Sequence, residues 1–436
     1  MRGYAFVLAL LGLLACSDDS GEPAEPVAPS PPEKAPPVEV SDDDLAALEA
    51  PPSPEEFAGV AETELPSVAT LDLATPDRGC ITVTDAPVRI WPSAGPTTVL
   101  GVGDRFIVAG HASRPEGGEH LFVLSVAPER PPRPLRTVSL DAPLSATDRK
   151  APPALIQRGP SRLYVAAVDA RGRVVAGDIH TGSATARLPL TAVGEGADTR
   201  FAPALGQTGD HTIVAWTARG TPMRVQTNVI NAEGTSLSRQ NVTPPTMGGA
   251  APAFIDGAEP PRLVFMDPRA GLSPIVWLRF PEGQPEEATV ARPVGTATEP
   301  PRVVGAMVGE RPFAAYTAVG DLATTAVGLV PLGDGGSGAP TPLVPGTGYG
   351  VLQVDAVSTG GSAVFAASVP TDTPPTAPRT IHVRRVDSEG PGEPLTIAGP
   401  NEHGERPAIG RRSDGTLAVT FVSEDAIYAA WVRCAS

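Results

Sequence analysis

Arginine is the residue type in this chain whose placement best suits ligand chemistry. Four arginines stand just before, or at the start of, short apolar segments: Arg149, Arg200, Arg302 and Arg406. A guanidinium group binds carboxylate, phosphate or sulfate through paired, charge-assisted hydrogen bonds. If these segments line one channel, the four side chains meet at one mouth as a candidate anion site. The chain has 31 Arg and two Lys, so a general preference for arginine as the surface cation is the competing explanation.

No other residue set has a spacing typical of catalysis or metal binding. The six histidines, at positions 111, 120, 180, 211, 382 and 403, have no metal-ligand spacing. The sequence contains no His-Glu-x-x-His, no Gly-x-Ser-x-Gly and no phosphate-binding glycine-rich loop. We therefore predict no metal, no cofactor and no catalytic residue from the sequence.

The first sixteen residues have the features of an export signal. Arg2 gives a positive start, the segment from Ala5 to Leu14 is apolar apart from one glycine, and Cys16 follows Ala15. An apolar run of this length is too short to cross ~30 Å of hydrocarbon as a helix. The Leu-Leu-Ala-Cys ending resembles a bacterial lipobox. The resemblance implies a signal peptide over 1–16, acylation of Cys16 and a lipid bilayer as a partner.

The segment 17–78 has the composition of a spacer. Residues 17–64 contain fourteen Asp or Glu, one Lys and ten Pro, and such a segment cannot bury enough apolar surface to offset its ordering entropy. We expect an acidic, Pro-rich, disordered tether with short helices beginning near Ser41 and Ser53. Ser17 after the cysteine favours the outer membrane of a Gram-negative cell envelope.

The acidic charge of the chain belongs mainly to this tether. The whole chain has a net charge of −16 and residues 17–64 have −13, which leaves −4 on residues 65–436 once Arg2 is also counted. The remaining domain has no basic excess, so we expect no nucleic-acid partner.

Residues 79–436 contain an internal repeat of β-strands. A short apolar strand recurs from Arg105, Leu163, Thr212, Arg262, Pro312, Ala363 and Leu417. Consecutive copies start 49 to 58 residues apart. Apolar segments about ten residues before and after each copy predict four antiparallel strands per repeat, which is the size of one propeller blade. We predict an all-β, seven-bladed β-propeller of four-stranded antiparallel blades.

The two ends of this domain are predicted to share the last blade. The repeat that starts at Arg406 stops after three strands, and the segment Cys80–Trp91 has no repeat partner of its own. This N-terminal strand therefore completes the last blade. Cys80 and Cys434 then lie on paired strands, and in an exported protein we expect a disulfide between them. Two separate buried thiols are the alternative.

Strands such as Pro407-Ala-Ile-Gly410 and Val214-Ala-Trp-Thr217 resemble those of exported bacterial propellers, including sialidase-like ones. The turn Ser413-Asp-Gly-Thr-Leu417 departs from the Asp-box of that family in spacing and in lacking Trp. We favour a monomeric, membrane-tethered binding or scaffolding propeller whose partner is a glycan or an envelope protein. A sialidase-like glycan hydrolase is the alternative, and an envelope assembly factor is a third hypothesis.

Overall fold

The computed structural model describes residues 78–92, 95–113, 119–140, 151–180, 190–269, 274–291, 296–297, 302–319, 325–333, 340–344, 353–371, 378–399, 401 and 403–435. These residues are almost entirely β-strand, with one short 3-10 helix, η3 (Pro281–Gly283). Within these ranges no helix combines the length and the apolar character that crossing a bilayer requires. The predicted signal peptide, Cys16, the tether up to residue 77 and Arg149 lie outside the described residues.

Consecutive strands pair antiparallel into sheets. The first sheet contains β3 (Thr97–Val102), β4 (Arg105–Ser113), β5 (Glu119–Ala127) and β6 (Arg130–Leu140). The second contains β7 (Ala154–Gly159), β8 (Arg162–Val168), β9 (Val174–His180) and β10 (Thr191–Gly194). The third contains β11 (Ala204–Thr208), β12 (His211–Ala218), β13 (Arg224–Ile230) and β14 (Ser236–Asn241).

Two further four-stranded sets join into one nine-stranded sheet, because β15 and β20 also pair in parallel. The first set contains β15 (Ala250–Asp256), β16 (Arg262–Met266), β17 (Ile275–Arg279) and β18 (Thr289–Ala291). The second contains β20 (Val303–Val308), β21 (Arg311–Val319), β22 (Thr325–Pro331) and β23 (Thr341–Val344), with β19 (Thr296–Ala297) beside β21.

The next sheet contains β24 (Val354–Ser358), β25 (Ala363–Pro370), β26 (Arg379–Asp387), β27 (Gly390–Pro391) and β28 (Leu395–Ile397). The last contains β29 (Glu405–Arg411), β30 (Leu417–Ser423) and β31 (Ala426–Cys434), together with β1 (Cys80–Thr82) and β2 (Val88–Trp91). The recurring strands predicted from the sequence are all present, as β4, β8, β12, β16, β21, β25 and β30.

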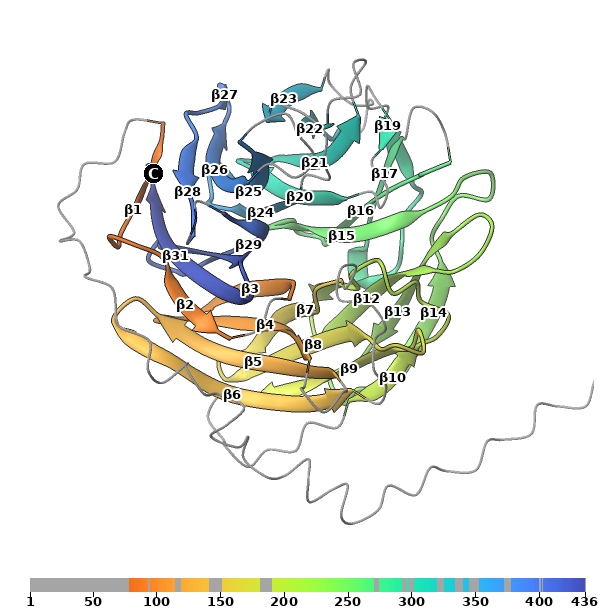
Figure 1. Cartoon of the computed structure of the whole chain (residues 1–436). Helices are drawn as coiled ribbons and strands as arrows, with labels where there is room; N and C mark the ends of the chain where they lie inside the picture. The colour runs from red at the N-terminus through yellow and green to blue at the C-terminus, as the bar shows by residue number, and fades with distance from the viewer. Residues whose placement is uncertain are drawn as a thin grey trace, which may run out of the picture.

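The sheets stand around a central axis as in a β-propeller (Figure 1). Each apolar cluster of the core lies between two consecutive sheets, and the last cluster joins the final sheet back to the first through Trp431, Ile427, Phe106 and Phe122. Both faces of most sheets are therefore buried, which explains why the second strands are continuously apolar and do not alternate. Burying one such aromatic or branched side chain contributes about 1.5–3 kcal/mol.

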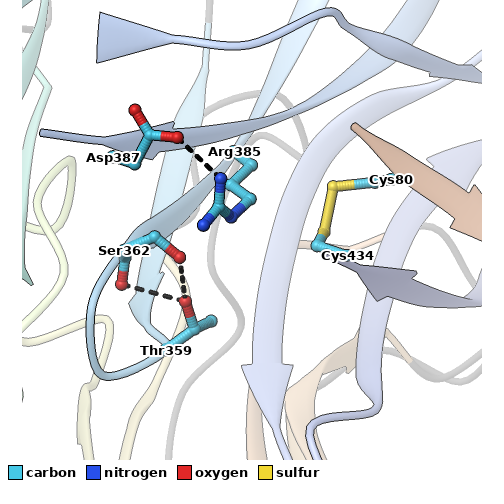
Figure 2. The surroundings of a disulfide bond; sticks show 6 residues. All are labelled: Cys80, Thr359, Ser362, Arg385, Asp387 and Cys434. Atoms are coloured by element: carbon cyan, nitrogen blue, oxygen red, sulfur yellow. Dashed lines mark hydrogen bonds and ion pairs between the residues drawn. A yellow bond between two sulfur atoms is a disulfide. The ribbon is translucent and has the colours of Figure 1, made fainter. Parts of the chain in front are cut away.

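The final sheet closes the ring, as the sequence predicted, but with a difference in detail. Cys80–Trp91 is not one strand. The chain breaks at residues 83–87 into β1 and β2, and both pair antiparallel with β31. Cys80 lies opposite Cys434, and the two are joined by a disulfide with a Cα–Cα distance of 4.0 Å (Figure 2). The predicted disulfide is therefore confirmed.

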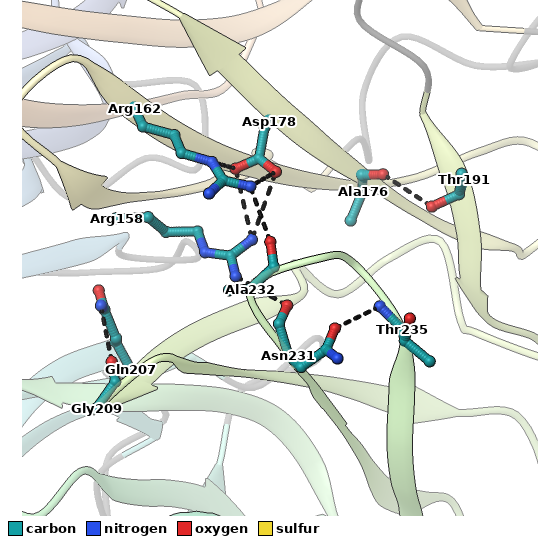
Figure 3. A network of polar contacts seen from close by, with 10 residues as sticks. All are labelled: Arg158, Arg162, Ala176, Asp178, Thr191, Gln207, Gly209, Asn231, Ala232 and Thr235. Atoms are coloured by element: carbon teal, nitrogen blue, oxygen red, sulfur yellow. Dashed lines mark hydrogen bonds and ion pairs between the residues drawn. The ribbon is translucent and has the colours of Figure 1, made fainter.

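Arginine side chains also hold neighbouring sheets together. Arg162 makes a two-pronged hydrogen bond to Asp178 within the second sheet, at 2.8 and 2.9 Å, and also donates to the carbonyl of Ala232 in the third. Arg158 likewise reaches the carbonyl of Asn231 at 2.9 Å (Figure 3). This network shows one use of arginine in the chain that is structural and needs no ligand.

Candidate functional site

The first strands of the sheets surround a central cavity, which we call the mouth. It has a volume of about 540 Å³ and is lined at the start of β3, β7, β11, β15, β20, β24 and β29. Because every sheet begins at the axis, residues just before these strands face the same space. Arg200, Arg302 and Arg406 all belong to this lining.

A local distortion of the backbone accompanies the position of Arg406. Its φ is 51°, in the left-handed region, and the register of β29 with β30 shifts between Glu405 and Ala408. Ala251 in β15 has the same features, with a φ of 55° and a shift between Ala250 and Ala253. A bulge of this kind bends a strand and re-aims a side chain. Both residues precede a proline that lines the mouth.

Arg302 is the arginine of the mouth with the most unusual environment. No described residue forms a hydrogen bond or an ion pair with its guanidinium group, and the nearest charged influence is Arg406. Burial, and then the like charge of Arg406, lower the pKa of Arg302 to about 10. The side chain still carries its charge at neutral pH. A buried charge without a counter-ion is costly.

Arg200 differs from Arg302 because a carboxylate of the protein, that of Asp198, balances its charge. Its guanidinium binds both carboxylate oxygens of Asp198, at 2.7 and 3.0 Å, and lies 5.4 Å from the ring centre of Phe201. Burial opposes ionisation of Asp198, but the bonds from Arg200 prevail and hold the pKa of this carboxyl below its usual value. Of the four predicted arginines, the structure thus places three in one lining, and Arg149 lies outside the described residues.

The sequence prediction missed two polar residues of the mouth, Gln353 and Asp355. The side-chain oxygen of Gln353 is buried and has no hydrogen-bond donor among the described residues. Gln353 stands immediately before β24, just as Arg302 stands immediately before β20. Alignment of the repeats at that position would have found it.

A second cavity, the far chamber, continues the channel. Its volume is about 730 Å³, and it shares Thr98, Leu155, Leu205, Phe254 and Asp355 with the mouth. Glycine makes room at this junction: a β-carbon on Gly206 would stand 2.6 Å from the ring of Phe254.

Asp355 lies where the two cavities meet. Its carboxylate accepts hydrogen bonds from the backbone N–H groups of Ile409 and Ala356, both at 2.9 Å. Burial, with a smaller contribution from the charge of Asp256, raises the pKa of Asp355 to about 6. The carboxylate thus ties β24 to β29 and titrates near neutrality.

Polar groups of the far chamber bind one another. The backbone N–H of Ser358 donates to the carboxylate of Asp256 at 2.6 Å, and the Ser358 hydroxyl donates to the carbonyl of Asp256. That hydroxyl also accepts from the N–H of Met307 at 2.9 Å, and Arg411 donates to the carbonyl of Ser358 at 3.3 Å. These bonds link the inner strands β15, β20, β24 and β29.

The described residues carry little that suggests catalysis. Nowhere in the described ranges do three His, Cys, Asp or Glu side chains gather as a metal site. Asp355 is the one acidic residue among the described residues that line the mouth, and no tyrosine lies in that lining. The described mouth therefore lacks the carboxylate pair and tyrosine that a sialidase-like hydrolase would use.

Comparison with known proteins supports the fold. The sequence matches no protein-family model and no curated protein. The structure is similar to that of the BP39L lectin from Burkholderia pseudomallei, with a TM-score of 0.50 and 17% identity, over 74% of this chain and 94% of the lectin. It is also similar to an ulvan lyase bound to GlcA(1-4)Rha3S, with a TM-score of 0.50 and 9% identity, over 77% and 93% of the two chains. At these identities the likeness shows the β-propeller fold alone.

Proposed function

We propose that this protein is a lipid-anchored, monomeric binding module of the bacterial cell envelope whose seven-bladed propeller holds an anionic glycan at its mouth. The blade count follows from assigning β15–β18 and β20–β23 to separate blades, although the short parallel pairing joins them.

Arg302 carries this proposal. Arg302 is half-buried in the lining of the mouth, its guanidinium group has no acidic partner among the described residues, and Arg406 adds a second positive charge to the same lining. An anion that accepts hydrogen bonds from the guanidinium group of Arg302 would offset the cost of burying that charge. The mouth, at about 540 Å³, falls within the ~300–1,000 Å³ range of ordinary ligand pockets.

We choose a glycan as the ligand class because the lining of the mouth combines cationic side chains with neutral polar groups. Gln353 offers an amide beside the arginines, and Pro152, Pro203 and Pro252 offer apolar surface on the same lining. A sugar acid has hydroxyl groups, an apolar C–H face and a carboxylate or sulfate, and so complements all three. One fold neighbour is a lectin and the other was solved with GlcA(1-4)Rha3S, so propellers of this shape accommodate such ligands.

Titration calorimetry with glucuronate, galacturonate and a sulfated monosaccharide, with glucose as the neutral comparison, tests the proposal. We expect the acidic sugars to bind and glucose to fail. A hydrogen bond to a charged group contributes about 1.5–3 kcal/mol, so Arg302→Gln should weaken binding about ten-fold or more. Arg200→Gln is the matched control and should change it little. Binding that is equal in Arg302→Gln and the original protein would refute the site.

The anchor requires a separate experiment. The lipobox resemblance assigns acylation to Cys16, and two or three acyl chains give stable attachment where one does not. Metabolic labelling with a fatty acid should mark the original protein and not Cys16→Ala, which should become soluble or remain unprocessed. Unchanged labelling and membrane fractionation of Cys16→Ala would exclude the anchor.

A further inference from the structure

The N-terminal end of the propeller lies on the face opposite the mouth. Arg406 of β29 lines the mouth, and Arg411 at the other end of the same strand lines the far chamber. Strand β30 returns toward the mouth and β31 leads away from it, since each pairs antiparallel with the strand before. Cys434 ends β31, and Cys80 lies opposite. Cys80, which follows the predicted tether closely in the sequence, therefore lies on the far-chamber face, opposite the mouth.

The strands that follow the tether are poorly suited to resist such a pull by themselves. β1 has three residues and β2 has four, and both lie at the outer edge of the last sheet, bonded only to β31. A force on the end of β1 is resisted only by the few hydrogen bonds of its short ladder with β31. Each such bond contributes only about 0.5–1.5 kcal/mol net.

The disulfide changes which strand receives the force. Through Cys434 the pull passes into β31, which pairs with β30 over Ala426–Val432 on one side and with β1 and β2 on the other. A pull along this strand shears both ladders at once. Because Cys80 is the first residue of β1, a pull from the N-terminal side reaches the bridge before it loads any hydrogen bond of β1.

A second attachment lies just before the bridge. Arg78 binds both carboxylate oxygens of Asp387, at 2.8 and 3.2 Å, and the carbonyl of Gly390 at 2.9 Å. Arg385 donates to the same carboxylate at 2.7 Å and lies close to the disulfide (Figure 2). A β-carbon at Gly392 would stand 2.1 Å from the carbonyl oxygen of Arg78, so glycine allows this close approach. The tether is thus attached to the sheet of β24–β28 as well.

We propose that the Cys80–Cys434 bridge and the Arg78–Asp387 pair form a mechanical clamp that carries load from the tether into the propeller while its mouth holds an immobile partner. The physiological load rests on the proposed anchor and ligand. The clamp itself is a property of the folded domain and can be measured without either.

Optical-tweezers pulling of residues 17–436 tests the clamp. One handle is attached at the N-terminus and the other to an azide-bearing amino acid at Leu237, an exposed position on β14. The oxidised protein should resist until the ring ruptures. In Cys80→Ala/Cys434→Ala we expect an earlier step at lower force. It should lengthen the chain by about 50 Å, which is the contour of residues 78–91 at ~3.3–3.6 Å each. Arg78→Ala with the bridge intact should lower the first rupture force by less.

A control separates this clamp from a general loss of stability. Handles at Leu237 and Val290, both exposed and remote from the bridge in sequence, should give the same rupture force in both proteins. An N-terminal pull without the early step in the double variant, or an equal fall in force with the control handles, would overturn the clamp. Neither result depends on acylation of Cys16 or on anion binding.

Discussion

The two ends of the central channel use charged residues in opposite ways. At the mouth, Arg302 is half-buried in the same lining as Arg406, with no carboxylate bound to it among the described residues. In the far chamber, Asp256, Ser358 and Arg411 bind one another and the backbone of adjacent strands. Charged residues of the far chamber therefore hold the inner strands together. The guanidinium group of Arg302 at the mouth forms no such bond with a described residue.

Asp355 stands between these two uses. It lines both cavities, yet its two carboxylate oxygens bind backbone N–H groups. The difference between the ends teaches that proximity to a cavity does not by itself make a residue a ligand contact. The partners that the fold already supplies decide the role.

The largest effect should come from breaking the close strand packing of the far chamber. A β-carbon on Gly101 of β3 would stand 1.8 Å from the carbonyl oxygen of Arg411, and the obstructing atoms belong to the backbone, which shifts less easily than the end of a side chain. We expect Gly101→Ala to lower the free energy of unfolding by about 3 kcal/mol, as for severe overpacking. Urea denaturation measures it. Gly361→Ala is the control, since an added β-carbon there meets no atom within 4 Å. Equal losses in the two variants would contradict this packing.

Asp355 should give the propeller a pH dependence of stability. Its folded pKa of about 6 lies above the ordinary value of 3.8, so between these values the folded state binds the proton more tightly. Stability is then greatest at low pH and decreases as pH rises through about 6, by up to about 3 kcal/mol. Asp355→Asn should lack this decrease. Urea unfolding from pH 4 to 7 compares the slopes, and parallel curves would exclude the assignment.

Arg302 should reduce stability while it serves binding. Because burial and Arg406 lower its pKa to about 10, the folded state disfavours the charged form of Arg302. We expect Arg302→Gln to raise the free energy of unfolding by about 1–2 kcal/mol, less than the full shift implies because glutamine is also polar. Arg200→Gln should lower it, since Asp198 loses its partner. A lower melting temperature for both variants would show that Arg302 is a structural residue.

The smallest effect should come from removing the carboxylate partner of Arg200, which leaves this arginine without an acidic partner as Arg302 is, and the effect is on ligand binding. Asp198→Asn removes the negative charge that neutralises Arg200, and should strengthen binding of an acidic sugar by a few-fold. Since Arg200 is 43% exposed, the gain stays below about 1 kcal/mol and falls with added salt. Calorimetry at two salt concentrations measures it. Unchanged or weaker binding would show that Arg200 does not reach the ligand.

Much of the fold follows from local patterns in the sequence. The recurring strands that start near Arg105, Thr212 and Leu417 are continuously apolar because both faces of their sheets are buried. This pattern is local, so the sequence determines it. The sequence also predicted the pairing of Cys80 with Cys434. The last repeat has only three strands, and the N-terminal segment was the one strand without a place in a repeat.

The sequence predicted part of the candidate site. The placement of Arg200, Arg302 and Arg406 just before, or at the start of, the first strands of their repeats predicted that they share a mouth. Their different roles could not be predicted from the sequence, because each role depends on whether a carboxylate such as Asp198 lies within hydrogen-bond distance of the arginine. Gln353 carries no charge, so its residue type alone does not mark it as an anion-site residue, although it stands immediately before β24 as Arg302 stands before β20.

The sequence by itself determined the repeat, the closing strand pair and the positions that face the axis, because each depends on periodicity along the chain. Only the tertiary structure decided which charges are satisfied. Asp355 meets Ile409, and Asp256 meets Ser358, across 54 and 102 positions of sequence. Such contacts depend on how closely neighbouring strands approach at the axis, and that distance is set by packing around the whole ring.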